Sequence, residues 1–292
     1  MYMLIIPSPI FELTPAKLLE AQELAPGLVL LYLEKHRVTE RIMAQTEIIY
    51  GCPEPSMLSD AAALKWHHLS NAGIEPYGDL RLYANKNVTL TKASGTYGIT
   101  IAEHALGMTL SLLRMLPRYQ NQQREHVWRR IQEKRELGGS TVLVLGMGDL
   151  GSQTAVRFRA LGCYVIGMAR SELPPRREAS ETISTEGLFH ALSRADIIIN
   201  CLPHTEHTEG IIGRVAFNAM KPGAVYINVG RGRTTDQAAL TSALESGRLW
   251  GAGLDVTNPE PLPDESPLWD MENVIITPHS AEIGRASCRE RV

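Results

Sequence analysis

Arg231, Glu260 and His279 are the residues of this chain whose types and positions best suit catalysis. Each follows a short apolar run in the second half of the sequence. If those runs are parallel strands of one sheet, their carboxyl ends meet at the edge where such sheets bind ligands. Arginine can hold a carboxylate and polarise a carbonyl, and histidine can supply a proton if a carboxylate stabilises its imidazolium. Each residue alone could be an ordinary surface side chain, so the prediction depends on the shared edge.

The segment Gly146-Met147-Gly148-Asp149-Leu150-Gly151 has the glycine spacing of a dinucleotide-binding loop. It follows an apolar run and opens a helical pattern, which is the context that supports such a motif. The first glycine would make a tight turn, the second would let a pyrophosphate approach, and the third would let the helix pack on the strand. The helix dipole favours the negative charge of the pyrophosphate. The alternative is a glycine turn without a ligand. The residues predicted to contact the cofactor are Gly146, Gly148, Asp149, Leu150 and Gly151.

The end of the next apolar run bears on which dinucleotide is bound. A site specific for NAD has Asp or Glu about 20 residues after the glycines, where it holds the ribose 2′-hydroxyl. This chain has Met168-Ala169-Arg170-Ser171 there, without an acid. Because a guanidinium forms charge-assisted bonds to phosphate, Arg170 with Ser171 favours NADP over NAD. In the alternative, Arg170 stacks on the adenine and Glu172 holds the ribose. A nicotinamide beside the three strand-end residues would suit hydride transfer to a 2-oxo acid.

From Thr141 onward, apolar runs alternate with amphipathic segments, which predicts a parallel sheet covered on both faces. The expected strands are Thr141–Leu145, Tyr164–Met168, Asp196–Cys201, Ala224–Asn228, Gly251–Val256 and Val274–Thr277. The expected helices are Gly151–Leu161, Glu186–Ala195, Gly213–Met220 and Thr235–Ser246.

The first hundred residues follow the same alternation more weakly. Strands are expected at Met3–Ile6, Val29–Leu33, Glu47–Tyr50, Lys65–Ser70 and Val88–Thr91, with a helix at Thr14–Glu23. The segment from Ile99 to about Gln122 predicts one long helix, kinked at Pro117, that bridges the two halves. The mixed charges of Arg124–Glu136 indicate a solvated helix face. The fold class is therefore α/β, with two domains built on doubly wound parallel sheets.

Length and composition agree with this organisation. A chain of 292 residues suggests about two domains. The net charge of −3, from 29 basic and 32 acidic residues, argues against a nucleic-acid partner. No apolar stretch is long enough to span a bilayer, and Met1–Ile6 lacks the basic residues of a signal peptide. Four scattered cysteines without a CxxC pair fit a reducing compartment, so we expect a cytoplasmic protein without a membrane partner.

Other residues suggest chemistry less strongly. Cys201, His204 and His207 have ligand-like spacing, but no fourth ligand is evident, so no metal site is predicted. The adjacent histidines at 67 and 68, and His104, are expected to pack or to form structural hydrogen bonds. The final segment, 282–292, matches the translation of a sequencing-adapter oligonucleotide, so we expect it to be foreign to the natural chain. An ordinary terminal tail is the alternative.

Four motifs resemble those of the D-2-hydroxyacid dehydrogenases: VLGMGDLG (144–151), INVGRG (227–232), GLDVTNPEPLP (253–263) and TPHS (277–280). The resemblance implies that Arg231 binds substrate and that Glu260 pairs with a catalytic His279. It implies further that Asp255 holds the nicotinamide carboxamide. By the same resemblance, the amides of the Ser70–Gly73 loop, at Asn71, Ala72 and Gly73, receive the substrate carboxylate. Pro203-His204-Thr205 and Thr208 would face the cofactor.

The resemblance also implies a flavodoxin-like substrate domain over 1–98 and an NAD(P)-binding Rossmann domain over 99–281. In the family the chain continues past the TPH motif and returns to the first domain. We expect an NADP-preferring 2-oxoacid reductase that acts on glyoxylate, hydroxypyruvate or a longer relative. It would give the (R)-2-hydroxy acid and form a homodimer through the region around Ile99–Gln122. Glu260 separates the chain from the formate dehydrogenases, which have Gln there. The alternative is a dinucleotide-sensing protein like the family's corepressors, which keep the same triad.

Overall fold

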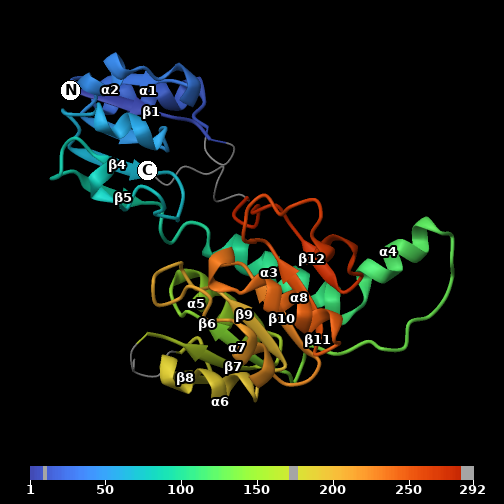
Figure 1. Cartoon of the computed structure of the whole chain (residues 1–292). Helices are drawn as coiled ribbons and strands as arrows, with labels where there is room; N and C mark the ends of the chain where they lie inside the picture. The colour runs from blue at the N-terminus through green and yellow to red at the C-terminus, as the bar shows by residue number, and fades with distance from the viewer. Residues whose placement is uncertain (9–11, 171–176, 284–292) are drawn as a thin grey trace. The chain divides into compact units, whose positions relative to one another are not determined.

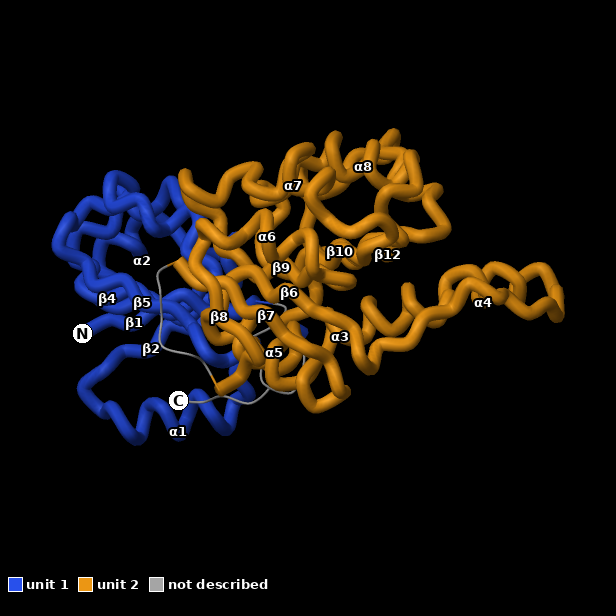
Figure 2. The backbone as a smooth tube through the Cα atoms, turned by 90° about the horizontal axis from the view of Figure 1, so that it is seen from below, with its two compact units in different colours: residues 1–97, 283–292 blue, residues 98–282 orange. Residues whose placement is uncertain are grey.

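The computed structural model describes residues 1–8, 12–170 and 177–283. The chain forms two compact units, Met1–Tyr97 with Ile283 (unit 1) and Gly98–Glu282 (unit 2), coloured separately in Figure 2. Each unit contains its own parallel sheet, so the predicted fold class is confirmed.

Within the described residues, unit 1 has a five-stranded sheet in the order β2-β1-β3-β4-β5 (Figure 1). This is the strand order of flavodoxin-like folds. The strands are β1 (Tyr2–Ile5), β2 (Val29–Tyr32), β3 (Ile48–Tyr50), β4 (Trp66–Leu69) and β5 (Thr89–Lys92). The helices are α1 (Pro15–Leu24), α2 (Glu40–Gln45) and the 3₁₀ turns η1 (Lys35–Arg37), η2 (Pro55–Ser59) and η3 (Leu80–Leu82).

His67 lies in the core of unit 1, where it is fully buried on β4. Its Nδ1 lies 2.8 Å from Tyr83 Oη and its Nε2 lies 2.9 Å from the Gly51 carbonyl oxygen, so both ring nitrogens have partners. Burial lowers the pKa of His67 to about 4. His67 is therefore a neutral structural residue that links β4 to two neighbouring segments, as the sequence predicted.

Among the described residues, unit 2 contains a seven-stranded parallel sheet in the order β12-β11-β10-β9-β6-β7-β8. The strand order reverses between β6 and β9, which makes that point of the sheet edge the expected ligand crevice. The strands are β6 (Thr141–Leu145), β7 (Tyr164–Met168), β8 (Glu181–Ile183), β9 (Ile197–Asn200), β10 (Ala224–Asn228), β11 (Leu249–Leu254) and β12 (Val274–Ile276).

Helices cover both faces of the unit 2 sheet, as Figure 2 shows. Helices α3 and α5 pack on one face, and α6, α7 and α8 on the other. They are α3 (Gly98–Leu113), α4 (Leu116–Arg124), α5 (Asp149–Ala160), α6 (Leu188–Leu192), α7 (Arg214–Ala219) and α8 (Gln237–Glu245). The 3₁₀ turns are η4 (Thr185–Gly187), η5 (Gly232–Thr234) and η6 (Pro267–Asp270).

The helix predicted from Ile99 to Gln122, with a kink at Pro117, is divided near that proline and does not bridge the two units. It consists of two helices, α3 and α4, that meet at 66°. The break lies at Met115, which has a left-handed φ of 59°, and Pro117 follows in the first turn of α4. Helix α3 belongs wholly to unit 2 and buries Ala102, Ala105 and Met108 there.

Two further local predictions need correction. The predicted helix face at Arg124–Glu136 is wrong, because residues 127–136 form no helix or strand. Strand β8 was not expected, since its half-buried residues include Glu181 and lack the continuous apolar run of the central strands. It is an edge strand, paired only with β7 among the described strands.

Among the described residues, no single helix has the length and apolar character to cross a membrane. The bent pair of α3 and α4 meets that test only when the two helices are taken together.

Candidate active site

The loops that carry Arg231, Glu260 and His279 lie at one edge of the unit 2 sheet. They follow β10, β11 and β12, which are adjacent parallel strands. Glu282 gives a second indication of their proximity. Burial raises the pKa of its carboxyl, and the charges of His279 and Arg231 oppose that rise. Both side chains thus lie within electrostatic reach of one carboxyl group.

Glu260 and His279 form a hydrogen-bonded pair. His279 Nδ1 lies 2.9 Å from Glu260 Oε2, while Glu260 Oε1 accepts a bond from the Thr257 amide at 3.0 Å. An ionised carboxylate can only accept, so Nδ1 carries the proton of this bond and Nε2 is the nitrogen that can exchange a proton with a ligand. Both side chains are 41% exposed, which leaves them accessible to a ligand.

The backbone at His279 has a left-handed conformation, with a φ of 48°. Such a conformation costs about 1–3 kcal/mol at a residue other than glycine and persists where the surroundings hold it. Asp255 provides these contacts. Its carbonyl oxygen accepts the His279 amide at 2.8 Å, and its carboxylate accepts Thr277 Oγ1 at 2.6 Å and the Ser280 and Ala281 amides at 3.0 and 3.2 Å.

Asp255 therefore anchors the histidine loop, a role that its place in the sequence did not indicate. The residue is 3% exposed at the end of β11. His104 on α3 belongs to the same cluster, because its Nε2 lies 2.9 Å from Thr277 Oγ1 and 3.8 Å from Asp255 Oδ1. The expected structural hydrogen bond of His104 is present. Its partner could not be inferred, because 173 residues separate His104 from Thr277.

Arg231 is half-buried, and its Nη1 donates to the Gly230 carbonyl at 2.8 Å. The next residue, Gly232, touches the segment that leads to Glu260. A Cβ at Gly232 would lie 1.8 Å from the Thr257 carbonyl oxygen, so only glycine fits. This close approach brings the Arg231 loop against the Thr257–Glu260 turn.

The glycine loop after β6 fits a dinucleotide. Gly146 has a φ of 92°, which a side chain would strain, and a Cβ at Gly151 would lie 1.9 Å from the Gly146 carbonyl oxygen. In contrast, a Cβ at Gly148 would meet no atom within 4 Å, so the space beside that backbone is open. Asp149 and Leu150 begin α5, where backbone amides lack partners inside the helix.

The residues predicted to select the cofactor lie after β7. Arg170 is exposed, two residues beyond the end of the strand. Ser171 and Glu172 lie outside the described residues. The choice between NADP and NAD stays a prediction at this point.

The loop after β9 carries Pro203 and Thr208. Pro203 is exposed, and Thr208 Oγ1 donates to its carbonyl oxygen at 2.7 Å, which closes the turn. The Thr205 amide donates to Thr208 Oγ1 at 2.8 Å.

Burial raises the pKa of the Cys201 thiol to about 12, which disfavours the thiolate that metal binding needs. Within the described residues no group of three His, Cys, Asp or Glu could hold a metal.

The predicted carboxylate-binding loop lies in unit 1, directly after β4. The Ser70 carbonyl oxygen accepts Tyr97 Oη at 2.5 Å, and the Asn71 carbonyl oxygen accepts the Ala93 amide at 3.1 Å. Asn71 Oδ1 is buried and has no hydrogen-bond partner in the described part of the chain. Ala72 and Gly73 are half-buried. Two hydrogen bonds to backbone carbonyl oxygens therefore fix the start of this loop.

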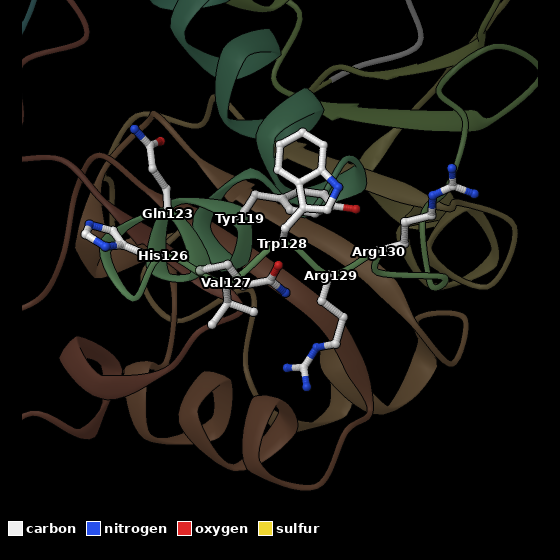
Figure 3. A pocket seen from close by; sticks show the side chains of 8 residues that line it. Tyr119, Gln123, His126, Val127, Trp128, Arg129 and Arg130 are labelled. Atoms are coloured by element: carbon white, nitrogen blue, oxygen red, sulfur yellow. The ribbon is translucent and has the colours of Figure 1, made fainter.

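A hollow of about 610 Å³ lies elsewhere in unit 2, beside α4 (Figure 3). Its walls come from α4 and the segment that follows, including Tyr119, His126 and Trp128. None of the predicted site residues lines it. This hollow therefore does not belong to the candidate active site.

The chain is similar in sequence to proteins of one known family. The NAD-binding domain model of the D-isomer specific 2-hydroxyacid dehydrogenases matches residues 106–281. The D-3-phosphoglycerate dehydrogenase of Mycobacterium tuberculosis is 36% identical over 221 residues, which cover 75% of this chain and 42% of that protein. The chain therefore spans less than half the length of that relative.

Two solved structures are similar over nearly the whole chain. A D-isomer specific 2-hydroxyacid dehydrogenase family protein from Aeromonas salmonicida is 32% identical, with a TM-score of 0.84 over 97% of this chain and 90% of that one. The NADPH-dependent glyoxylate/hydroxypyruvate reductase of Sinorhizobium meliloti, in complex with NADP and sulfate, is 30% identical. Its TM-score is 0.80 over 97% of this chain and 89% of that one.

Proposed function

This chain belongs to the D-isomer specific 2-hydroxyacid dehydrogenase family, and we propose that it reduces a small 2-oxo acid to the (R)-2-hydroxy acid with NAD(P)H. The observation that carries the proposal is the 2.9 Å contact between His279 Nδ1 and Glu260 Oε2. The pair lies at the sheet edge where the glycine loop Gly146–Gly151 also opens.

In the proposed reaction, a reduced nicotinamide held by the glycine loop and Asp255 would supply the hydride that the carbonyl carbon receives. His279 donates the proton from Nε2 to the carbonyl oxygen, while Glu260 holds Nδ1 and stabilises the imidazolium. Arg231 binds the substrate carboxylate and polarises the carbonyl. In the reverse direction, His279 accepts the hydroxyl proton.

We assign the substrate contacts of the first domain, 1–98, to the amides of Asn71, Ala72 and Gly73. This assignment follows the family resemblance; the buried, unpartnered Asn71 Oδ1 is an acceptor, so it suits a hydrogen-bond donor of a ligand and not its carboxylate. Residues 99–281 form the dinucleotide domain of the proposal.

The proposed cofactor contacts are the glycine loop, Arg170 with Ser171, and the turn at Pro203 and Thr208. Asp255 is the remaining contact of the proposal, and it holds the carboxamide group of the nicotinamide. We favour NADP over NAD because Arg170 is exposed and suits a 2′-phosphate. The glyoxylate/hydroxypyruvate reductase described above, which uses NADPH, supports this preference and suggests glyoxylate or hydroxypyruvate as the substrate.

We further propose a homodimer formed through α4, which overlaps the region expected from the resemblance, and through residues 125–136 that follow it; we call this part of unit 2 the arm. Helix α4 and the segment after it project from the unit 2 sheet in both views (Figures 1 and 2). The arm exposes large apolar side chains: Trp128 completely, Leu116 by 51% and Val127 by 40%. Exposed apolar groups at one place are typical of a protein interface. Sedimentation of the wild type and of Trp128→Glu tests the dimer, which the charge should weaken.

Steady-state oxidation of NADPH and NADH against a panel of 2-oxo acids tests the activity. We expect turnover with NADPH preferred, and the best substrate defines the branch of the family. Tight dinucleotide binding without turnover by a folded protein would instead favour the alternative, a dinucleotide-sensing protein without enzymatic activity. The reducing compartment suggested by the scattered cysteines makes the cytoplasm the proposed location.

A further inference from the structure

Two asparagines end adjacent strands of the unit 2 sheet in the same way. Asn200 is the last residue of β9, Asn228 is the last residue of β10, and the two are register partners. Each side-chain Oδ1 accepts the backbone amide two residues further along the chain. Asn200 binds the Leu202 amide and Asn228 binds the Gly230 amide, both at 3.1 Å. Each asparagine therefore shapes the loop that follows its own strand.

The amide nitrogen of Asn200 connects its strand to the segment after β10. Asn200 Nδ2 donates to Tyr226 Oη at 2.9 Å and to Thr234 Oγ1 at 2.8 Å. Tyr226 Oη lies 2.6 Å from Thr235 Oγ1 in a second hydroxyl contact. Asn200, Tyr226 and Thr234 are fully buried. Burial raises the pKa of Tyr226 to about 12, so its hydroxyl stays protonated at neutral pH.

The side-chain amide nitrogen of Asn228 makes the remaining hydrogen bonds of this group. Asn228 Nδ2 donates to Thr235 Oγ1 at 3.1 Å and to the Arg231 carbonyl oxygen at 3.2 Å. The same carbonyl oxygen accepts Thr234 Oγ1 at 2.6 Å. The bonds therefore form a closed ring, which runs from Asn200 through Tyr226, Thr235 and Asn228 to the Arg231 carbonyl and returns through Thr234.

The ring ties together two loops that the proposed function uses. One is the Leu202–Pro203 segment, which faces the cofactor in the proposal, and the other is the turn that carries Arg231. Strands buried on both faces are normally apolar throughout, as Ile197–Ile199 are here. A polar residue at 200 or 226 is therefore costly unless each of its groups is paired. Loss of one member leaves its neighbours buried and unpaired, so the ring behaves as a unit.

We propose that Asn200 and Tyr226 are positioning residues: their buried ring holds the Arg231 loop and the Leu202–Pro203 loop in one fixed relation, so that binding of the 2-oxo acid and of the dinucleotide reinforce each other. This inference depends on the proposed function, because it takes the ligands of both loops from it. Neither residue touches a ligand in the proposal, and both act through the loops.

Tyr226→Phe removes the central hydroxyl of the ring and keeps the aromatic ring packed against Phe217. The matched control is Thr109→Val, which removes a fully buried hydroxyl bonded to the Ala105 carbonyl oxygen in α3, outside the ring. NADPH affinity is measured by fluorescence with and without oxamate, an unreactive 2-oxo acid analogue. The ratio of the two Kd values is the coupling factor, which is the same for either order of binding.

We expect oxamate to tighten NADPH binding in the wild type by a factor of about 5–150. In Tyr226→Phe this factor should fall by at least about threefold, while Thr109→Val keeps the wild-type factor. An unchanged factor in Tyr226→Phe, or no coupling in the wild type, overturns the inference. Failure of the wild type to bind either dinucleotide refutes the proposed function instead.

A measurement without ligands tests the ring itself. Hydrogen exchange should accelerate in both loops of the Tyr226→Phe protein, at 200–202 and at 229–235, because both lose support from one hydroxyl. Thr109→Val should leave both loops as protected as in the wild type. Acceleration confined to 229–235, next to the mutated strand, would show that the ring does not join the two loops.

Discussion

Glu260 and His279 meet at 2.9 Å because separate backbone contacts hold each of them. The Thr257 amide binds the second oxygen of Glu260, and the Asp255 carbonyl oxygen binds the His279 amide. Both contacts come from the segment that follows β11. One segment therefore sets the position of the carboxylate and of the imidazole, and the pair is preorganised before any ligand binds.

Glu260→Gln should keep a hydrogen bond to His279 but remove the negative charge. The imidazolium then lacks its stabilising partner, so the rate of 2-oxo acid reduction should fall by about 10²-fold at neutral pH. The measurement is kcat for 2-oxo acid reduction at saturating substrate. Glu265→Gln, an exposed acid of the same segment, is the control. A wild-type kcat in Glu260→Gln would remove the carboxylate from the mechanism.

Two glycines of the loop should respond differently to alanine. At Gly148 the added Cβ meets no protein atom within 4 Å, so Gly148→Ala should fold normally and weaken NADPH binding by filling the cofactor's space. At Gly151 the Cβ would lie 1.9 Å from the Gly146 carbonyl oxygen, so Gly151→Ala should lose about 1–3 kcal/mol of stability. Thermal melting and NADPH titration separate the two effects.

Gly107→Ala is the control for both variants, because it adds a Cβ in open space within α3. Alanine is favoured over glycine inside a helix by about 0.5–1 kcal/mol, so this variant should be slightly more stable. Its NADPH affinity should equal that of the wild type. Unaltered NADPH binding by Gly148→Ala would place the pyrophosphate elsewhere.

Arg170→Ser should discriminate between the two dinucleotides. Hydrogen bonds to a charged group contribute about 1.5–3 kcal/mol, so the KM for NADPH should rise by about 10-fold to 100-fold. The KM for NADH, which lacks the 2′-phosphate, is the internal control and should stay within about twofold. An equal change for both cofactors would mean that Arg170 stacks on the adenine.

His67 should make unit 1 sensitive to acid. The unfolded chain takes up a proton near the ordinary histidine pKa of 6.5 and the folded chain only near 4, so stability falls as the pH drops between these values. The loss amounts to about 2 kcal/mol at pH 5 relative to pH 7. Hydrogen exchange of β4 at the two pH values measures it. His67→Gln should remove most of the difference, whereas the exposed His36→Gln should keep it. The same pH difference in His67→Gln would assign the acid sensitivity to another group.

The central strands were predictable because their signal is local. Three predicted strands, at Thr141–Leu145, Tyr164–Met168 and Ala224–Asn228, have the bounds of β6, β7 and β10. Each is apolar almost throughout and ends at a turn or a polar residue, and this pattern reflects burial on both faces of a sheet. Elements that depend on distant contacts were harder to predict from the sequence. Examples are the edge strand β8 and the break between α3 and α4.

The sequence by itself determined the fold class, the glycine loop and the sheet edge at which Arg231, Glu260 and His279 gather, because spacing along the chain controls these features. Only the tertiary structure decided which side chains meet. Asn200 joins Tyr226, and His104 joins Thr277, through strand register and helix packing. Hydrogen bonds between residues far apart in the chain depend on how the elements pack in space, which no local pattern of residue types records.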